Sequence, residues 1–105
     1  MIATGNILVP TAFTPNSSGP SGGSYNPNSL DNTVFFPYTV GVDDFHMMIF
    51  NRWGELIFET FDLKIGWDGY YRGQLSKQDV YVWKINARFN DNRVFSKAGD
   101  VTLLR

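Results

Sequence analysis

The residue types that could carry out catalysis are few and scattered along the chain. One histidine, His46, lies in the middle of an apolar run, and the 105 residues include no cysteine. Without cysteine there are no disulfides, zinc–thiolate sites, iron–sulfur clusters or cysteine nucleophiles. No nucleophile-elbow motif accompanies His46, so a structural or partly exposed imidazole is favoured over a catalytic one. We therefore predict that the protein is not an enzyme and uses no cofactor.

The carboxylates do not form a general acid–base pair. Asp43 and Asp44 are adjacent, so in an extended segment their side chains should point to opposite faces. Glu55 and Glu59 would share one face of a strand, but about two pleats apart. We interpret both pairs as solvent-exposed side chains at the edges of strands.

Residues 14–33 are rich in Gly, Pro, Asn and Ser, a composition that favours turns. We predict a flexible inserted loop, because a connection of this length is usually functional or disordered. Asn16, Asp31 and Asn32 could offer oxygen ligands to calcium, but only Asp31 is charged. A tight calcium site usually has two or more carboxylates, so calcium is a weak candidate.

Aromatic side chains are abundant: nine Phe, five Tyr and three Trp. Arg52 and Trp53 stand together in Asn51–Gly54, which is predicted to be a hairpin turn, and these two residue types dominate interface hot spots. The alternative is that Trp53 packs inward while Arg52 binds a loop carbonyl or Asp68. The segment 67–69 could likewise form a structural corner in which Asp68 caps backbone donors.

A sugar-binding platform is the other use for these rings. Trp53, Trp67, Tyr70 and Tyr71 lie on or beside predicted loops, where they could stack on pyranose faces. The competing interpretation is that the two tryptophans close the ends of the core.

These side chains must be positioned by strands, because no helical period of apolar residues persists. The clearest strand is 79–89, where Tyr81, Trp83, Ile85, Ala87 and Phe89 alternate with polar residues. Residues 62–78 should form an irregular connection. Gly99 and Asp100 are expected to break the last part of the chain into two strands. The expected strands cover residues 7–9, 34–36, 45–51, 55–59, 79–89, 93–97 and 101–104. About seven short strands predict an all-β, Ig-like sandwich with Greek-key connections, in one domain.

Composition excludes two classes of partner. The net charge is −1, which argues against a nucleic-acid binder, since such proteins need a basic face. No run of 18 apolar residues is present, so no membrane span is expected.

Five segments, in order, carry a family resemblance. Val9–Asn16 reads VPTAFTPN, and Ile49–Glu59 reads IFNRWGELIFE. Gly66–Gly69 reads GWDG, Asp79–Trp83 reads DVYVW, and Gly99–Arg105 reads GDVTLLR. Together they resemble the gliding-motility-associated C-terminal domain, the type B sorting domain of type IX secretion, over residues 7–105. The chain departs from that pattern at Ser17–Gly19, in an insertion of about ten residues before Leu30, at Lys77 in place of proline and at Asp79 in place of glycine.

The resemblance implies a non-catalytic C-terminal sorting domain, covalently linked to an upstream cargo. Outer-membrane secretion and attachment machinery would recognise it after export through the periplasm, so the cargo would be secreted or held on the cell surface. The residues expected to contact that machinery are Asn51, Arg52, Trp53, Gly54, Glu55, Trp67, Asp68, Gly69 and Arg105. The final strand, 101–105, could also bind by edge pairing. The alternative function is a carbohydrate-binding module of a cell-surface protein, with a glycan as partner.

Overall fold

The computed structural model describes residues 5–24 and 32–105, and every regular element in these residues is a β-strand. The strands are β1 (Asn6–Leu8), β2 (Ala12–Phe13), β3 (Tyr38–Val40), β4 (Val42–Phe50), β5 (Leu56–Thr60), β6 (Tyr70–Tyr71), β7 (Gln74–Leu75), β8 (Asp79–Phe89) and β9 (Val94–Leu103). The predicted all-β sandwich is therefore confirmed, with nine strands where about seven were expected.

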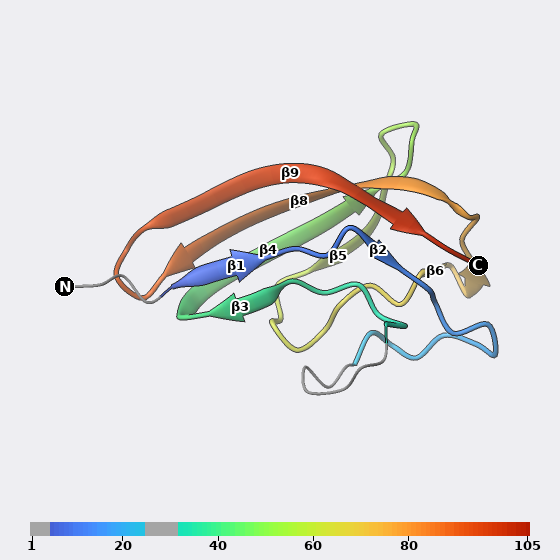
Figure 1. The fold of residues 1–105 in the computed structure, drawn as a ribbon, viewed down its shortest axis with the longest axis horizontal. Helices are drawn as coiled ribbons and strands as arrows, with labels where there is room; N and C mark the ends of the chain where they lie inside the picture. Colours follow the sequence, from blue (N-terminus) through green and yellow to red (C-terminus); the bar gives the residue numbers. More distant parts are fainter. Residues whose placement is uncertain (1–4, 25–31) are drawn as a thin grey trace.

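The main sheet has the strand order β2-β9-β8-β4-β5 (Figure 1). β8 is its central strand and pairs antiparallel with β4 on one side and with β9 on the other. β2 adds a short parallel pairing at the end of β9. β1 pairs with β3, and β6 with β7, in two separate two-stranded sheets.

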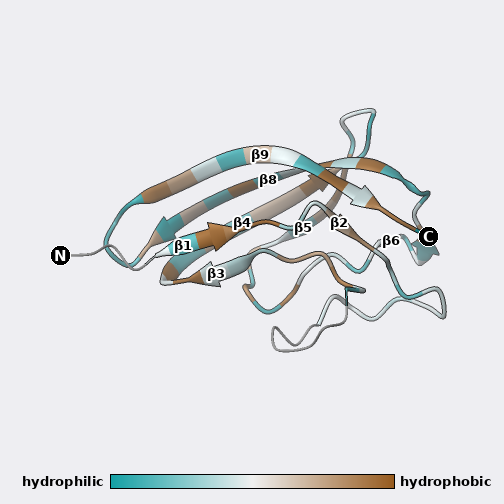
Figure 2. Cartoon of the chain, in the orientation of Figure 1, coloured by the Kyte–Doolittle hydropathy of each residue, from teal (hydrophilic) through white to brown (hydrophobic). Residues whose placement is uncertain are grey.

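The predicted alternation of β8 is confirmed. Tyr81, Trp83, Ile85, Ala87 and Phe89 are all buried, and the residues between them face outward. Figure 2 shows bands of different hydropathy along β8, where the exposed Val80 and Val82 interrupt the polar outer face. One face of the main sheet thus supplies one side of the core.

Phe13 of the short strand β2 and two aromatic side chains outside the main sheet complete the core. Phe13, Phe35 and Trp67 are fully buried. The Phe13 ring centroid lies 5.9 Å from that of Phe35 and 5.4 Å from that of Trp67, and Trp67 meets Tyr81 of β8 edge-on at 5.0 Å. Phe35 and Trp67 also exchange two backbone hydrogen bonds, of 2.8 and 2.9 Å. The segment 34–36, predicted as a strand, is reduced to this single bridge.

The predicted break at Gly99 is wrong, because β9 runs without interruption from Val94 to Leu103. Gly99 lies opposite Trp83, and a Cβ atom at this position would come within 2.6 Å of the Trp83 ring. The glycine is there because the indole packs over the strand, and it does not end the strand.

Two further predictions are wrong. A register shift between Val42 and Asp44 brings both carboxylates of the Asp43–Asp44 pair to Arg88, so they do not point to opposite faces. The connection 62–78, expected to be irregular, contains the β6–β7 hairpin, whose turn residues Arg72 and Gly73 both have positive φ.

Candidate partner-recognition site

Asn51 organises the turn between β4 and β5, which confirms the predicted hairpin turn. Its side-chain oxygen accepts hydrogen bonds from the backbone N–H groups of Trp53 and Glu55, each 3.0 Å long. Its side-chain amide donates to the Glu55 carboxylate at 2.9 Å. The N–H of Gly54 donates to the Asn51 carbonyl, and Gly54 has a φ of 81°, a conformation that glycine adopts without strain. The turn is therefore held in one shape by its own side chains.

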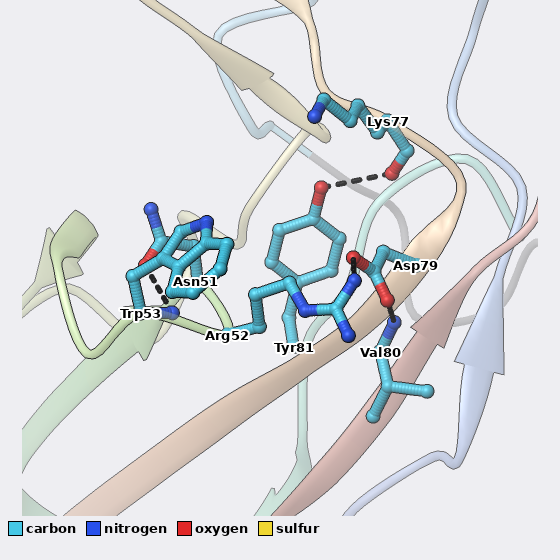
Figure 3. A network of polar contacts seen from close by, with 7 residues as sticks. All are labelled: Asn51, Arg52, Trp53, Lys77, Asp79, Val80 and Tyr81. Atoms are coloured by element: carbon cyan, nitrogen blue, oxygen red, sulfur yellow. Dashed lines mark hydrogen bonds and ion pairs between the residues drawn. The ribbon is translucent and has the colours of Figure 1, made fainter.

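This turn displays Trp53 to solvent. The side chain is 84% exposed, so the alternative that it packs inward is wrong. The Arg52 guanidinium lies 5.8 Å from the centre of the Trp53 ring and reaches towards the start of β8 (Figure 3). There its Nη1 lies 3.4 Å from Oδ2 of Asp79, whereas Asp68 or a loop carbonyl was the expected partner.

A hollow of about 170 Å³ lies between this turn and the chain that leads into β8. Tyr81 contributes to its wall, and its hydroxyl donates a 2.8 Å hydrogen bond to the Lys77 carbonyl (Figure 3). Burial is the main cause that raises the pKa of the Tyr81 phenol above 10.0, helped by the nearby Asp79 and opposed by Ser76 and Arg105. The phenol is therefore neutral at physiological pH. The lining residues are Asn51, Arg52, Trp53, Ile57, Tyr71, Ser76, Lys77, Asp79 and Tyr81.

Trp67 and its neighbours form a structural corner. Trp67 is fully buried and donates its indole N–H to the Tyr70 carbonyl at 3.2 Å, so its side chain is not available to a partner and its assignment to a docking surface is corrected. Asp68 accepts hydrogen bonds from the backbone N–H groups of Tyr70 and Gly22, at 3.0 and 3.2 Å, which is the capping role considered for it. Gly69 has a φ of 82° and packs against Pro15, so it also has a structural role in this corner.

The aromatic platform expected for a sugar is not assembled as predicted. Trp67 is in the core, and the Tyr70 hydroxyl donates to the Asn16 carbonyl at 2.6 Å. Of the four rings, Trp53 and Tyr71 line the same hollow.

The proposed calcium ligands are engaged locally where the structure describes them. The Asn16 side-chain oxygen accepts two hydrogen bonds from Ser18, and the Asn32 amide donates to the Ala12 carbonyl. Asp31 lies outside the described residues. Across residues 5–24 and 32–105, no three His, Cys, Asp or Glu side chains gather as a metal site would require.

His46 occupies a partly exposed surface position. Its Nε2 lies 2.6 Å from Oε2 of Glu59, and its ring stacks on Phe61 with centroids 4.2 Å apart. Glu55 is bound instead to the Asn51 amide, so the two glutamates serve different partners.

The chain end lies beside this site but does not offer a free edge. The N–H of Thr102 donates to the Thr11 carbonyl and that of Leu104 to the Phe13 carbonyl, each at 2.9 Å. The edge of residues 101–105 is therefore already paired with the β2 region, which corrects the expectation of edge pairing there. The N–H of Arg105 donates to the Gln78 side chain at 3.0 Å.

Sequence reasoning named Tyr71 as a possible sugar-stacking ring, but it did not place Lys77, Asp79 or Tyr81 opposite the turn. These residues come from two segments that only the fold brings together. The one available signal was the departure of Lys77 and Asp79 from the family pattern.

A small all-β sandwich that displays an Arg–Trp pair on a rigid turn has the form of a docking module. Comparison with protein families matches residues 7–103 to the CHU_C type IX secretion signal domain, and the chain belongs to this family. No curated protein and no solved structure matches significantly. Among the described residues, no helix is long and apolar enough to cross a membrane.

Proposed function

We propose that the domain is a non-catalytic docking signal that the type IX machinery recognises at the Asn51–Glu55 turn. It directs a covalently linked upstream cargo across the outer membrane to the cell surface or the medium. The observation that carries this proposal is the match over residues 7–103 to a secretion signal family, in a chain that exposes Trp53 on a rigid turn.

The physical argument rests on how the turn is built. A tryptophan that is 84% exposed leaves a large apolar ring in water, and such a ring releases that water when a partner covers it. Asn51 holds the backbone of the turn before any partner arrives, so little ordering entropy is lost on binding. Tryptophan and arginine are also the side chains most often found at the centre of interfaces.

The test is a fusion of residues 1–105 to the end of a periplasmically exported reporter, in a host with type IX secretion. Three fusions are compared: the wild type, Arg52→Ala with Trp53→Ala, and a control with Val94→Ala and Lys97→Ala. The control removes the exposed apolar side chain of Val94, about 20 Å along β8 from the turn, and the basic side chain of Lys97, about 10 Å along it. The reporter is assayed in the medium and on intact cells, and folding is checked by thermal melts.

We expect export of the wild type and the control, and loss of export in the folded Arg52/Trp53 double variant. Equal export of all three would place recognition on another surface. A folded wild-type fusion that stays in the periplasm would refute autonomous sorting.

Carbohydrate binding is the second candidate, because Trp53 and Tyr71 line one hollow. It predicts a shift of tryptophan fluorescence on addition of glycans, which Trp53→Ala abolishes. The hollow of about 170 Å³ is smaller than the roughly 300–1,000 Å³ usual for small-ligand pockets, which favours a protein partner.

A further inference from the structure

The hollow beside the turn is richer in cations than in carboxylates. We propose that it receives a carboxylate side chain from an acidic segment of the partner protein, an inference that rests on the proposed recognition role of the turn. Arg52 and Lys77 would bind the carboxylate, and the aromatic walls would contact its aliphatic stem and the apolar residues beside it.

The basic groups at the hollow are only lightly neutralised. The Arg52 side chain is 64% exposed, and its contact with Asp79 is long, at 3.4 Å. The other oxygen of Asp79 already accepts a 2.7 Å hydrogen bond from the N–H of Val80. Lys77 is exposed and, among the described residues, its ammonium forms no ion pair. A charge-assisted hydrogen bond of about 2.7–2.9 Å, donated by Arg52 to an incoming carboxylate, would thus be better than the contact that Arg52 now makes.

Further basic groups lie near the hollow, together with the Glu55 carboxylate of the turn. The Arg72 guanidinium lies 5.1 Å from the centre of the Tyr71 ring, at the rim of the hollow. The Arg105 charge lowers the pKa of the Tyr81 phenol, although the Asp79 charge raises it by more. Glu55, the acidic group of the turn, is bound to the Asn51 amide.

The walls suit an amino-acid side chain. Trp53, Tyr71 and Tyr81 present rings, and burial keeps the Tyr81 phenol neutral, so Asp79 is the one negatively charged group among the described lining residues. A volume of about 170 Å³ equals roughly five or six water molecules at about 30 Å³ each, which is room for one side chain. Figure 3 shows Arg52 and Lys77 near opposite ends of the Tyr81 side chain, and both residues line the hollow.

The first test is a titration of the ¹⁵N-labelled domain with a blocked peptide in which Glu alternates with Leu and Phe. We expect shifts of the Trp53 indole and Arg52 Nε–H signals at millimolar or lower peptide, weakened by added salt. The same peptide with Gln in place of Glu should bind at least tenfold more weakly. The absence of shifts at these two groups, or equal binding of both peptides, would overturn the proposal.

The second test is charge reversal in the exported fusion. The variant Arg52→Glu with Lys77→Glu is compared with Lys84→Glu and Lys97→Glu, which changes the net charge equally on exposed positions of β8 and β9. We expect the first variant to lose export at least tenfold and the second to be exported like the wild type. If the first variant does not fold, it is replaced by Arg52→Gln with Lys77→Gln. We expect export of this neutral variant to fall at least threefold.

The outcomes separate this inference from the proposed function. Wild-type export together with undiminished export of the charge-reversed variant would overturn the carboxylate contact and leave the sorting role intact. Failure of the wild-type fusion to be exported would refute the sorting role, and the peptide titration would still decide whether the hollow binds carboxylates.

Discussion

Replacing each of two tryptophans by alanine should separate the fold of this domain from its recognition surface. Trp67 is fully buried among Phe13, Tyr81 and the Phe35 bridge, and it donates a hydrogen bond to the Tyr70 carbonyl. Trp53 is 84% exposed on the turn. We expect Trp67→Ala to destabilise the domain strongly and Trp53→Ala to leave stability nearly unchanged while it abolishes export.

The magnitudes follow from burial. Truncating a fully buried Trp to Ala costs about 3–5 kcal/mol, because transfer free energy is lost and a cavity remains. That is a large share of the roughly 5–15 kcal/mol that stabilises a typical domain. In a chain of this length it lowers Tm by roughly 15–30 °C. An exposed substitution changes stability by about 0.5 kcal/mol or less, which moves Tm by a few degrees at most.

The assay is urea unfolding and thermal melting of the two variants and the wild type, followed by far-UV circular dichroism. Trp67→Phe is the matched control for Trp67→Ala and should lie between the two, because its ring fills part of the space but carries no N–H for the Tyr70 carbonyl. A Tm for Trp67→Ala within 5 °C of the wild type would refute the core assignment. A Trp53→Ala variant that melts more than 10 °C below the wild type would refute the exposed placement of that ring.

Three further predictions test the site and its supports. Gly69→Ala should cost more stability in urea unfolding than Gly73→Ala: both residues have φ near +80°, a strain of about 1–2 kcal/mol for alanine, but only Gly69 would also clash with a proline ring. Tyr81→Phe should cost about 1 kcal/mol at neutral pH for its lost hydrogen bond. Because the folded pKa of Tyr81 is raised above 10.0, the wild type should lose stability as pH rises from there through the folded value, and Tyr81→Phe should lose less in alkaline unfolding. Asn51→Ala should reduce export severalfold with Trp53 still present, because two backbone N–H groups of the turn lose their acceptor; an unchanged export level would refute preorganisation of the turn.

Local patterns predicted the elements that carry the site. The alternation of residues 79–89 determined which side chains of β8 face the core, because successive side chains of a strand point to opposite faces. The Asn51–Gly54 turn was also readable, since Asn and Gly supply the backbone conformations and hydrogen bonds that a tight turn needs. The motifs in the sequence pointed to the secretion signal family that the comparison found.

The sequence predictions were wrong at two places where the local pattern was compatible with more than one structure. Gly99 was interpreted as a strand break, whereas the indole of Trp83 requires a residue without a side chain in an unbroken β9. Asp43 and Asp44 were expected to diverge, but a register shift turns both towards Arg88. In each case the deciding partner is distant in the sequence.

The two tryptophans show where sequence alone reaches its limit. Both Trp53 and Trp67 stand beside glycine in short turn-like motifs, so the sequence placed both in turns but did not determine which one is covered. The tertiary structure buries Trp67 because the bridge to Phe35, the ring of Phe13 on β2 and the ring of Tyr81 on β8 enclose it. It exposes Trp53 because the β4–β5 turn extends past the sheet, with the hollow beside it built from chain some 20 to 30 residues further on. A side chain is buried only if other residues pack against it, and the tertiary fold determines which residues these are.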